Sequence, residues 1–151
     1  MVWECLSERS FGTYSNTENT IIAMPQDSET GRKGSEYGLT CGHKIIAALG
    51  GTPIRRGSNE FRLNGELLSL HCAHKGNGSV GVTYKMLERV DAVLAAFEQP
   101  DESYLILRLS QKQYKRNMQP TRSLGPSSGR VGKVGRVVFK SKGSVFKTVR
   151  T

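Results

Sequence analysis

The chain has 151 residues, of which 36% are hydrophobic, and it carries a formal net charge of +9. This length suits one domain with a modest core, and no apolar run is long enough to cross a membrane. The first residues lack the basic start and long apolar stretch of a secretion signal, so we expect a cytoplasmic, intracellular protein. Three cysteines, Cys5, Cys41 and Cys72, have no CxxC spacing and predict buried reduced thiols rather than a zinc site.

The positive charge is concentrated in the last third of the sequence. Residues 1–110 hold 11 Lys/Arg and 13 Asp/Glu, whereas residues 111–151 hold 11 Lys/Arg and no acid. A strongly basic segment on a near-neutral body is typical of a protein that binds a polyanion, most often nucleic acid. The alternative is a solvated basic tail, but the regular placing of its valines favours nucleic-acid contact. The side chains expected to contact phosphates are Arg122, Arg130, Lys133, Arg136, Lys140 and Lys142.

The first third of the chain predicts a polar segment followed by one helix. Residues 1–34 are rich in turn-forming residues, with a short strand expected at 20–24 and a loop at 27–34. Residues 35–49 predict a helix, because Tyr37, Cys41 and Ile45 recur at helical spacing and Ser35 is a suitable N-cap. Gly50 and Gly51 then indicate its end.

Residues 59–73 predict a β-hairpin with a tight turn at Asn64-Gly65. Alternation places Phe61 and Leu63 of the first strand, and Leu68, Leu70 and Cys72 of the second, on one apolar face. The opposite face receives Glu60 from the first strand, and Ser69 and His71 from the second. The hairpin therefore displays an acid and a histidine on one side, although an ordinary edge hairpin has the same pattern.

The remaining chain predicts more sheet and a basic end. Residues 83–98 indicate a short helical start followed by a strand that pairs with 104–109, with a continuous helix as the alternative. Residues 111–118 predict a short basic helix, and 120–129 a loop. Segments 134–140 and 144–149 are interpreted as a basic β-ribbon.

The order of helix, acidic strand, hairpin strand and paired apolar strands resembles the PD-(D/E)XK nuclease superfamily, over about residues 35–112. Within this superfamily, the chain most resembles the small restriction and homing-type members. This resemblance implies a restriction-endonuclease-like α/β fold, a mixed β-sheet flanked by helices. It divides the chain into a polar segment 1–34, a nuclease-like core 35–118 and a basic C-terminal arm 119–151, within one domain overall.

The resemblance also implies roles for individual residues. Glu36 corresponds to the helical acid, Glu60 to the motif aspartate, Ser69 to the second acid and His71 to the lysine. Two carboxylates, here Glu36 and Glu60, would hold a Mg²⁺ that activates water for phosphodiester hydrolysis. Serine and histidine depart from the motif, so the site is either rebuilt around Glu60, His71 and Lys75 or has decayed.

Three functions follow from these residues. The first is a Mg²⁺-dependent DNA endonuclease, expected to form a homodimer or higher oligomer because cutting both strands needs two sites. A weaker resemblance to tRNA-splicing endonucleases implies metal-free RNA cleavage by His71 with Lys75 or Lys85 and Tyr84. In the third, a nucleic-acid-binding or assembly module without chemistry, Glu60 pairs with Arg62 or Arg55.

Overall fold

The computed structural model describes residues 28–76, 78–121 and 129–151. The chain divides into two units, Met1–Arg32 and Lys33–Thr151, and both sheets and all helices after the first belong to the second unit. The expected strand at 20–24 lies outside the described residues, as does Cys5. The elements, in chain order, are α2 (Ser28–Leu49), β1 (Thr52–Pro53), β2 (Glu60–Leu63), β3 (Glu66–Ala73), β4 (Ser79–Thr83), α3 (Tyr84–Leu87), β5 (Ala92–Glu98), β6 (Tyr104–Ser110), α4 (Gln111–Asn117), β7 (Gln119–Pro120), β8 (Val131–Gly135), α5 (Arg136–Lys142) and β9 (Ser144–Val149).

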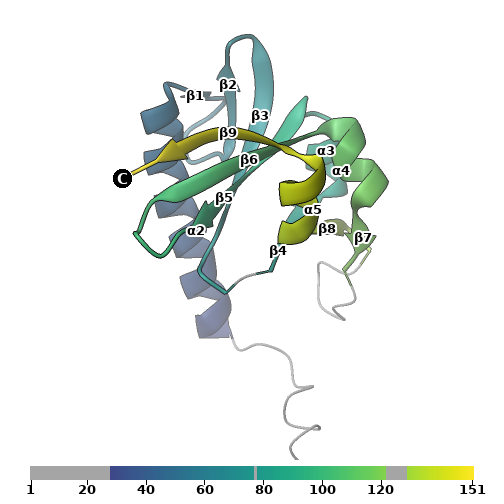
Figure 1. The fold of residues 1–151 in the computed structure, drawn as a ribbon, viewed down its shortest axis with the longest axis horizontal. Coiled ribbons are helices and arrows are strands. Elements are labelled where there is room, and N and C mark those ends of the chain that lie inside the picture. Colours follow the sequence, from purple (N-terminus) through teal and green to yellow (C-terminus); the bar gives the residue numbers. More distant parts are fainter. Residues whose placement is uncertain (1–27, 77, 122–128) are drawn as a thin grey trace, which may run out of the picture. The chain divides into compact units, whose positions relative to one another are not determined.

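The main sheet has six strands in the order β1-β2-β3-β5-β6-β9 (Figure 1). Neighbours are antiparallel except β3 and β5, which run parallel. The predicted hairpin is confirmed, with Asn64 and Gly65 both at positive φ, 52° and 84°, as a two-residue turn of type I′ requires. The order on which the nuclease resemblance rests, a helix, an acidic strand, its hairpin partner and two paired strands, is therefore present. The predicted mixed α/β class is confirmed.

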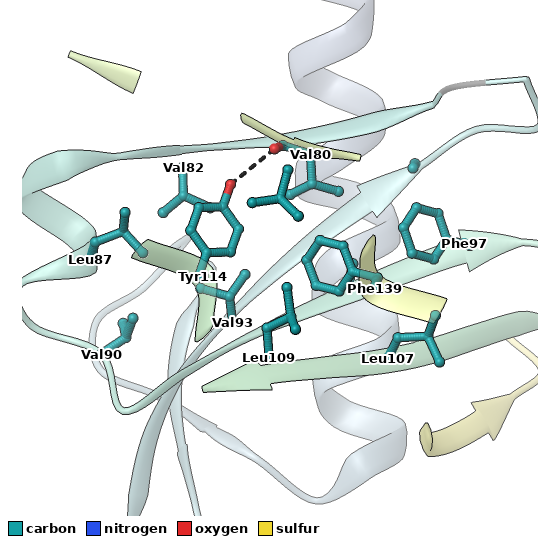
Figure 2. Packing of buried hydrophobic residues seen from close by; sticks show 13 residues of the cluster. Val80, Val82, Leu87, Val90, Val93, Phe97, Leu107, Leu109, Tyr114 and Phe139 are labelled. Atoms are coloured by element: carbon teal, nitrogen blue, oxygen red, sulfur yellow. Dashed lines mark hydrogen bonds between the residues drawn. The ribbon is translucent and has the colours of Figure 1, made fainter. Parts of the chain in front are cut away.

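Each face of this sheet packs against its own core. On one face, Cys41, Ile45 and Ile46 of α2 pack with Phe61 and Leu68 of the hairpin. The other face is covered by α3, α4, α5 and a second sheet of order β4-β8-β7, whose side chains surround Phe139 and Tyr114 (Figure 2). Successive residues of β5 alternate between the two cores and nearly all are fully buried, which explains the continuous apolar run of this strand.

Tyr114 connects the helix α4 to the second sheet within the layer that covers this face. Its hydroxyl proton is shared between two carbonyl oxygens, that of Val80 at 2.9 Å (Figure 2) and that of Gly132 at 2.8 Å, so α4 is tied to β4 and β8. Burial raises the pKa of this phenol well above its usual value, so it remains protonated and acts as a hydrogen-bond donor.

The predicted short helix at 111–118 and the predicted helical start before β5 are confirmed by α4 and α3.

The described part of segment 119–151 contributes strands to both sheets. Strand β9 pairs with β6 at the edge of the main sheet, and β8 pairs with β4. The predicted β-ribbon is wrong, because Arg136–Lys142 is the helix α5 and directs Phe139 into the core. Apolar side chains at 131–149 thus complete the fold, and the lysines between them remain exposed while Arg136 is half-buried.

Helix α2 also begins earlier than predicted, at Ser28 instead of residue 35. Glycines at 31 and 34 suggested a loop, but a serine and a glutamate at 28 and 29 suit the first turn of a helix. Glycine costs a helix about 1 kcal/mol relative to alanine, which the rest of a long helix can absorb. Among the helices of the described segments, none combines the length and hydrophobicity needed to span a bilayer.

Candidate functional site

The polar face of the hairpin brings Glu60, Ser69 and His71 together, as alternation predicted. Glu60 lies directly opposite Ser69 in the register of β2 and β3. Both are buried, with exposed fractions of 2% for Glu60 and 0% for Ser69. His71 follows on the same face of β3, and its Nε2 lies 3.2 Å from the Ser69 hydroxyl oxygen. Three of the residues given catalytic roles by the resemblance therefore form one polar cluster.

The Glu60 carboxylate is held by Arg89 on both of its oxygens. Arg89 Nε donates to Oε1 at 3.0 Å and Nη2 donates to Oε2 at 2.9 Å, a two-pronged ion pair. The pairing raises the pKa of Arg89. Ser58 fixes the backbone of the same residue, because its hydroxyl accepts from the Glu60 N–H at 3.0 Å. The suggestion that Glu60 pairs with Arg62 or Arg55 is therefore wrong.

His71 is held neutral at physiological pH. Burial lowers its pKa to about 4, although the nearby charge of Glu60 acts in the opposite direction. A neutral imidazole supplies no positive charge to a phosphate oxyanion, which is what the lysine of the resembled motif would do. As a base with a pKa near 4, it also takes up a proton weakly at pH 7.

We expect His71, which is half-buried on β3, to give a distinct pH dependence to folding stability. Its pKa is about 4 in the folded chain and 6.5 as the ordinary value, so only the unfolded chain gains a proton between these limits. The stability that His71 contributes is complete above pH 6.5, falls as the pH drops toward 4, and amounts to roughly 3 kcal/mol. Urea unfolding of wild type and His71→Gln across this window measures it. The exposed His43, changed to Gln, is the control and should follow wild type.

Two other residues expected at the site lie elsewhere. Glu36 is exposed on α2, the helix that packs on the Phe61 face of the sheet, whereas Glu60 is on the opposite face. Lys75 is exposed in the loop after β3, four residues beyond His71, which corresponds to roughly 13 Å of extended chain. The Lys75 backbone N–H donates to Glu98 at 3.3 Å, at the far end of β5.

The hairpin site does not fit Mg²⁺. A Mg²⁺ ion needs hard oxygen ligands in octahedral arrangement, usually including a carboxylate. Here both Glu60 oxygens are engaged by Arg89, and Ser69 stands where the second acid is expected. Across the described ranges, no group of three or more His, Cys, Asp or Glu side chains could hold a metal. The guanidinium of Arg89 occupies the position in which a cation would neutralise Glu60.

Sequence reasoning missed Arg89 altogether. It lies 29 positions beyond Glu60, just after α3, and its backbone N–H donates to the Met86 carbonyl at 3.0 Å. Nothing local in the sequence links these two positions, since the pair forms only when α3 packs on the sheet. Glu66, on the opposite face of the hairpin with Leu68, is likewise paired with Arg108 through two hydrogen bonds of 2.8 Å.

Six exposed cations of the basic segment lie on or directly before the elements that cover this same face of the sheet, whereas the exposed Lys147 and Arg150 lie on or directly after β9. Helix α4 adjoins α5, because Gln113 donates to the Lys142 carbonyl at 3.1 Å and Lys142 Nζ donates to Asn117 Oδ1 at 2.9 Å. Strand β8 runs directly into α5 (Figure 1). We call this group of exposed side chains the basic layer: Lys112, Arg116, Arg130, Lys133, Lys140 and Lys142.

Among the expected phosphate contacts that the structure describes, the basic layer leaves out Arg136 and adds two others. Arg136 is half-buried, with its guanidinium 4.9 Å from the centre of the Phe97 ring and its Nη2 3.5 Å from the His74 carbonyl oxygen. It therefore anchors α5 rather than facing solvent, while Arg122 lies outside the described residues. Lys112 and Arg116, four residues apart on one side of α4, belong to the predicted basic helix but were not among the expected phosphate contacts.

Among solved structures, this chain is similar to the 1.6 Å structure of Hjc, a Holliday junction resolvase from the archaeal hyperthermophile Archaeoglobus fulgidus. The match has a TM-score of 0.40 and 10% sequence identity, and it covers 76% of this chain and 92% of that chain. No model of a protein family matches the sequence, and no curated protein matches it. At this identity the likeness concerns the backbone arrangement and not the side chains at the hairpin.

Proposed function

We propose that this chain binds nucleic acid through the basic layer and does not cleave it at the hairpin. The observation that carries the proposal is the gathering of exposed lysines and arginines from α4, β8 and α5 on one layer. Residues 111–151 contain no acid to neutralise them. A surface of this kind neutralises a row of phosphates and releases their counterions. DNA is the expected partner, because the resemblance to the PD-(D/E)XK nuclease superfamily implies a protein that acts on DNA.

The geometry of the hairpin supports binding without chemistry. A Mg²⁺-dependent endonuclease would require a carboxylate free to coordinate the ion, and the Glu60 carboxylate is fully engaged by Arg89. Metal-free cleavage would require an effective base, and the His71 imidazole has a pKa of about 4. The expectation of a homo-oligomer depends on cutting two strands, so a protein that only binds carries no such requirement.

Salt dependence is the direct test of this binding mode. Neutralising five or six phosphates predicts a slope of about −5 when the logarithm of the association constant is plotted against that of salt concentration. Fluorescence anisotropy of a labelled 20-base-pair DNA duplex, measured over a range of salt concentrations, gives this slope. Binding that is absent at low salt, or that does not change with salt, would contradict the proposal.

A further inference from the structure

A pocket opens between α3 and α4, beside the basic layer. It has a volume of about 210 Å³ and is lined by Tyr84, Leu87, Glu88, Lys115 and Met118. Leu87 is buried, and Tyr84 and Met118 are half-buried and pack against the same core as Tyr114. The walls supplied by these three side chains are apolar, so the pocket offers an apolar surface in a region otherwise rich in charge.

The rim of the pocket is polar and carries both signs of charge. Lys115 Nζ lies 2.8 Å from Glu88 Oε1, and both side chains are accessible to solvent. The edges of nucleobases present hydrogen-bond donors and acceptors side by side, so a lysine beside a glutamate can satisfy both. A phosphate, by contrast, gains nothing from apolar walls and is repelled by Glu88.

Positively charged side chains surround the pocket and could contact the phosphates on either side of a bound base. Lys85 on α3, and Lys112 and Arg116 on α4, are all exposed on the two helices that form the pocket. A base placed on the Tyr84 ring would therefore have cations on both helices available for the phosphates that flank it. Proteins that bind single strands combine stacking on aromatic side chains with a cationic surface in this way.

We propose that this pocket receives one unpaired nucleobase, stacked on Tyr84 and flanked by Leu87 and Met118, while the basic layer holds the neighbouring phosphates. This inference rests on the proposed function and adds a preference to it. The substrate class becomes nucleic acid with at least one unstacked base, such as a single strand, a gap or a branch. An apolar side chain of a protein partner is the competing occupant, but the lysines and arginine around the pocket favour a polyanion.

The test uses the full chain and two DNA probes of equal length. One is a perfect duplex, and the other is a duplex with a single-stranded gap that carries one 2-aminopurine. We expect tighter binding of the gapped probe and quenching of 2-aminopurine when its base stacks on Tyr84. In Tyr84→Leu, which keeps the pocket apolar, the affinity for the gapped probe should fall by roughly 5- to 100-fold. Tyr37→Leu, on the opposite face of the sheet, is the matched control and should bind as wild type does.

The outcomes separate this inference from the function on which it rests. Equal affinity for both probes, or an unchanged affinity of Tyr84→Leu for the gapped probe, overturns the base pocket while salt-dependent duplex binding still stands. Quenching that persists in Tyr84→Leu also places the base elsewhere and overturns the pocket. Failure of both probes to bind at low salt overturns the pocket and the proposed function together. Circular dichroism confirms that each variant is folded before its affinity is compared.

Discussion

Reversing four cations of the basic layer should weaken DNA binding by at least about 100-fold at 0.1 M salt. The variant combines Lys112→Glu, Arg116→Glu, Lys133→Glu and Lys140→Glu, all exposed and drawn from α4, β8 and α5. Each change removes one phosphate contact and adds a repulsive charge. Fluorescence anisotropy with a labelled duplex measures the loss. The slope of affinity against salt should also become shallower by about 3 to 4, since four counterion-releasing contacts disappear.

A matched variant separates a local surface from the effect of net charge. Lys44→Glu, Arg55→Glu, Arg56→Glu and Arg62→Glu change the net charge by the same amount, at exposed positions on α2, before β2 and on β2. Lys44 lies on the helix that covers the opposite face of the sheet, and the three arginines lie on or just before β2, next to the edge strand β1, so the control should lose far less affinity. Equal losses in the two variants would show that overall charge, and not the layer formed by α4, β8 and α5, determines binding.

Replacing Arg89 by alanine should lower the midpoint of thermal unfolding by about 10 °C at pH 7. The side chain of Arg89 is 49% exposed, but its partner Glu60 is only 2% exposed. The variant therefore leaves a buried carboxylate without its partner, which is the costly way to break an ion pair. Differential scanning calorimetry at neutral pH measures the shift.

Two further variants test whether the buried carboxylate is the cause. Arg150→Ala removes an exposed arginine from Asp101, whose side chain is 55% exposed, so this pair should contribute little to the melting temperature. Replacing both members of the buried pair, as Glu60→Met with Arg89→Met, should recover most of the loss because no unpaired charge remains. A double variant that melts as low as Arg89→Ala would show that the arginine acts through packing instead.

The hairpin was predictable from the sequence because its determinants are local. An Asn-Gly pair specifies the turn, and the period of two then fixes which side chains share a face. The alternation correctly placed Glu60, Ser69 and His71 together, on the face opposite Leu68. The partner of Glu60 was not predictable, because Arg89 reaches it only through the packing of α3 on the sheet.

In the last third of the chain, by contrast, tertiary packing and not local sequence determines the secondary structure. Val137 and Val138 favour a strand by intrinsic preference, yet they lie in α5 because Phe139 completes the core from that helix. Gly143 then allows the chain to pass close to its neighbours. A Cβ at this position would lie 2.5 Å from the Phe139 carbonyl oxygen and 2.6 Å from that of Arg108. The charges of the segment were predictable from composition, but their placing on α4, β8 and α5 was not.

Nucleic acid should bind to this chain while the Glu60 site remains closed by Arg89. The most direct measurement incubates supercoiled plasmid and a labelled RNA with enough protein to saturate binding, in Mg²⁺ and in EDTA. We predict a complete mobility shift with no nicking of the plasmid and no shortening of the RNA. Nicking that requires Mg²⁺ and disappears in Glu60→Ala would contradict the claim, as would RNA cleavage in EDTA that disappears in His71→Ala.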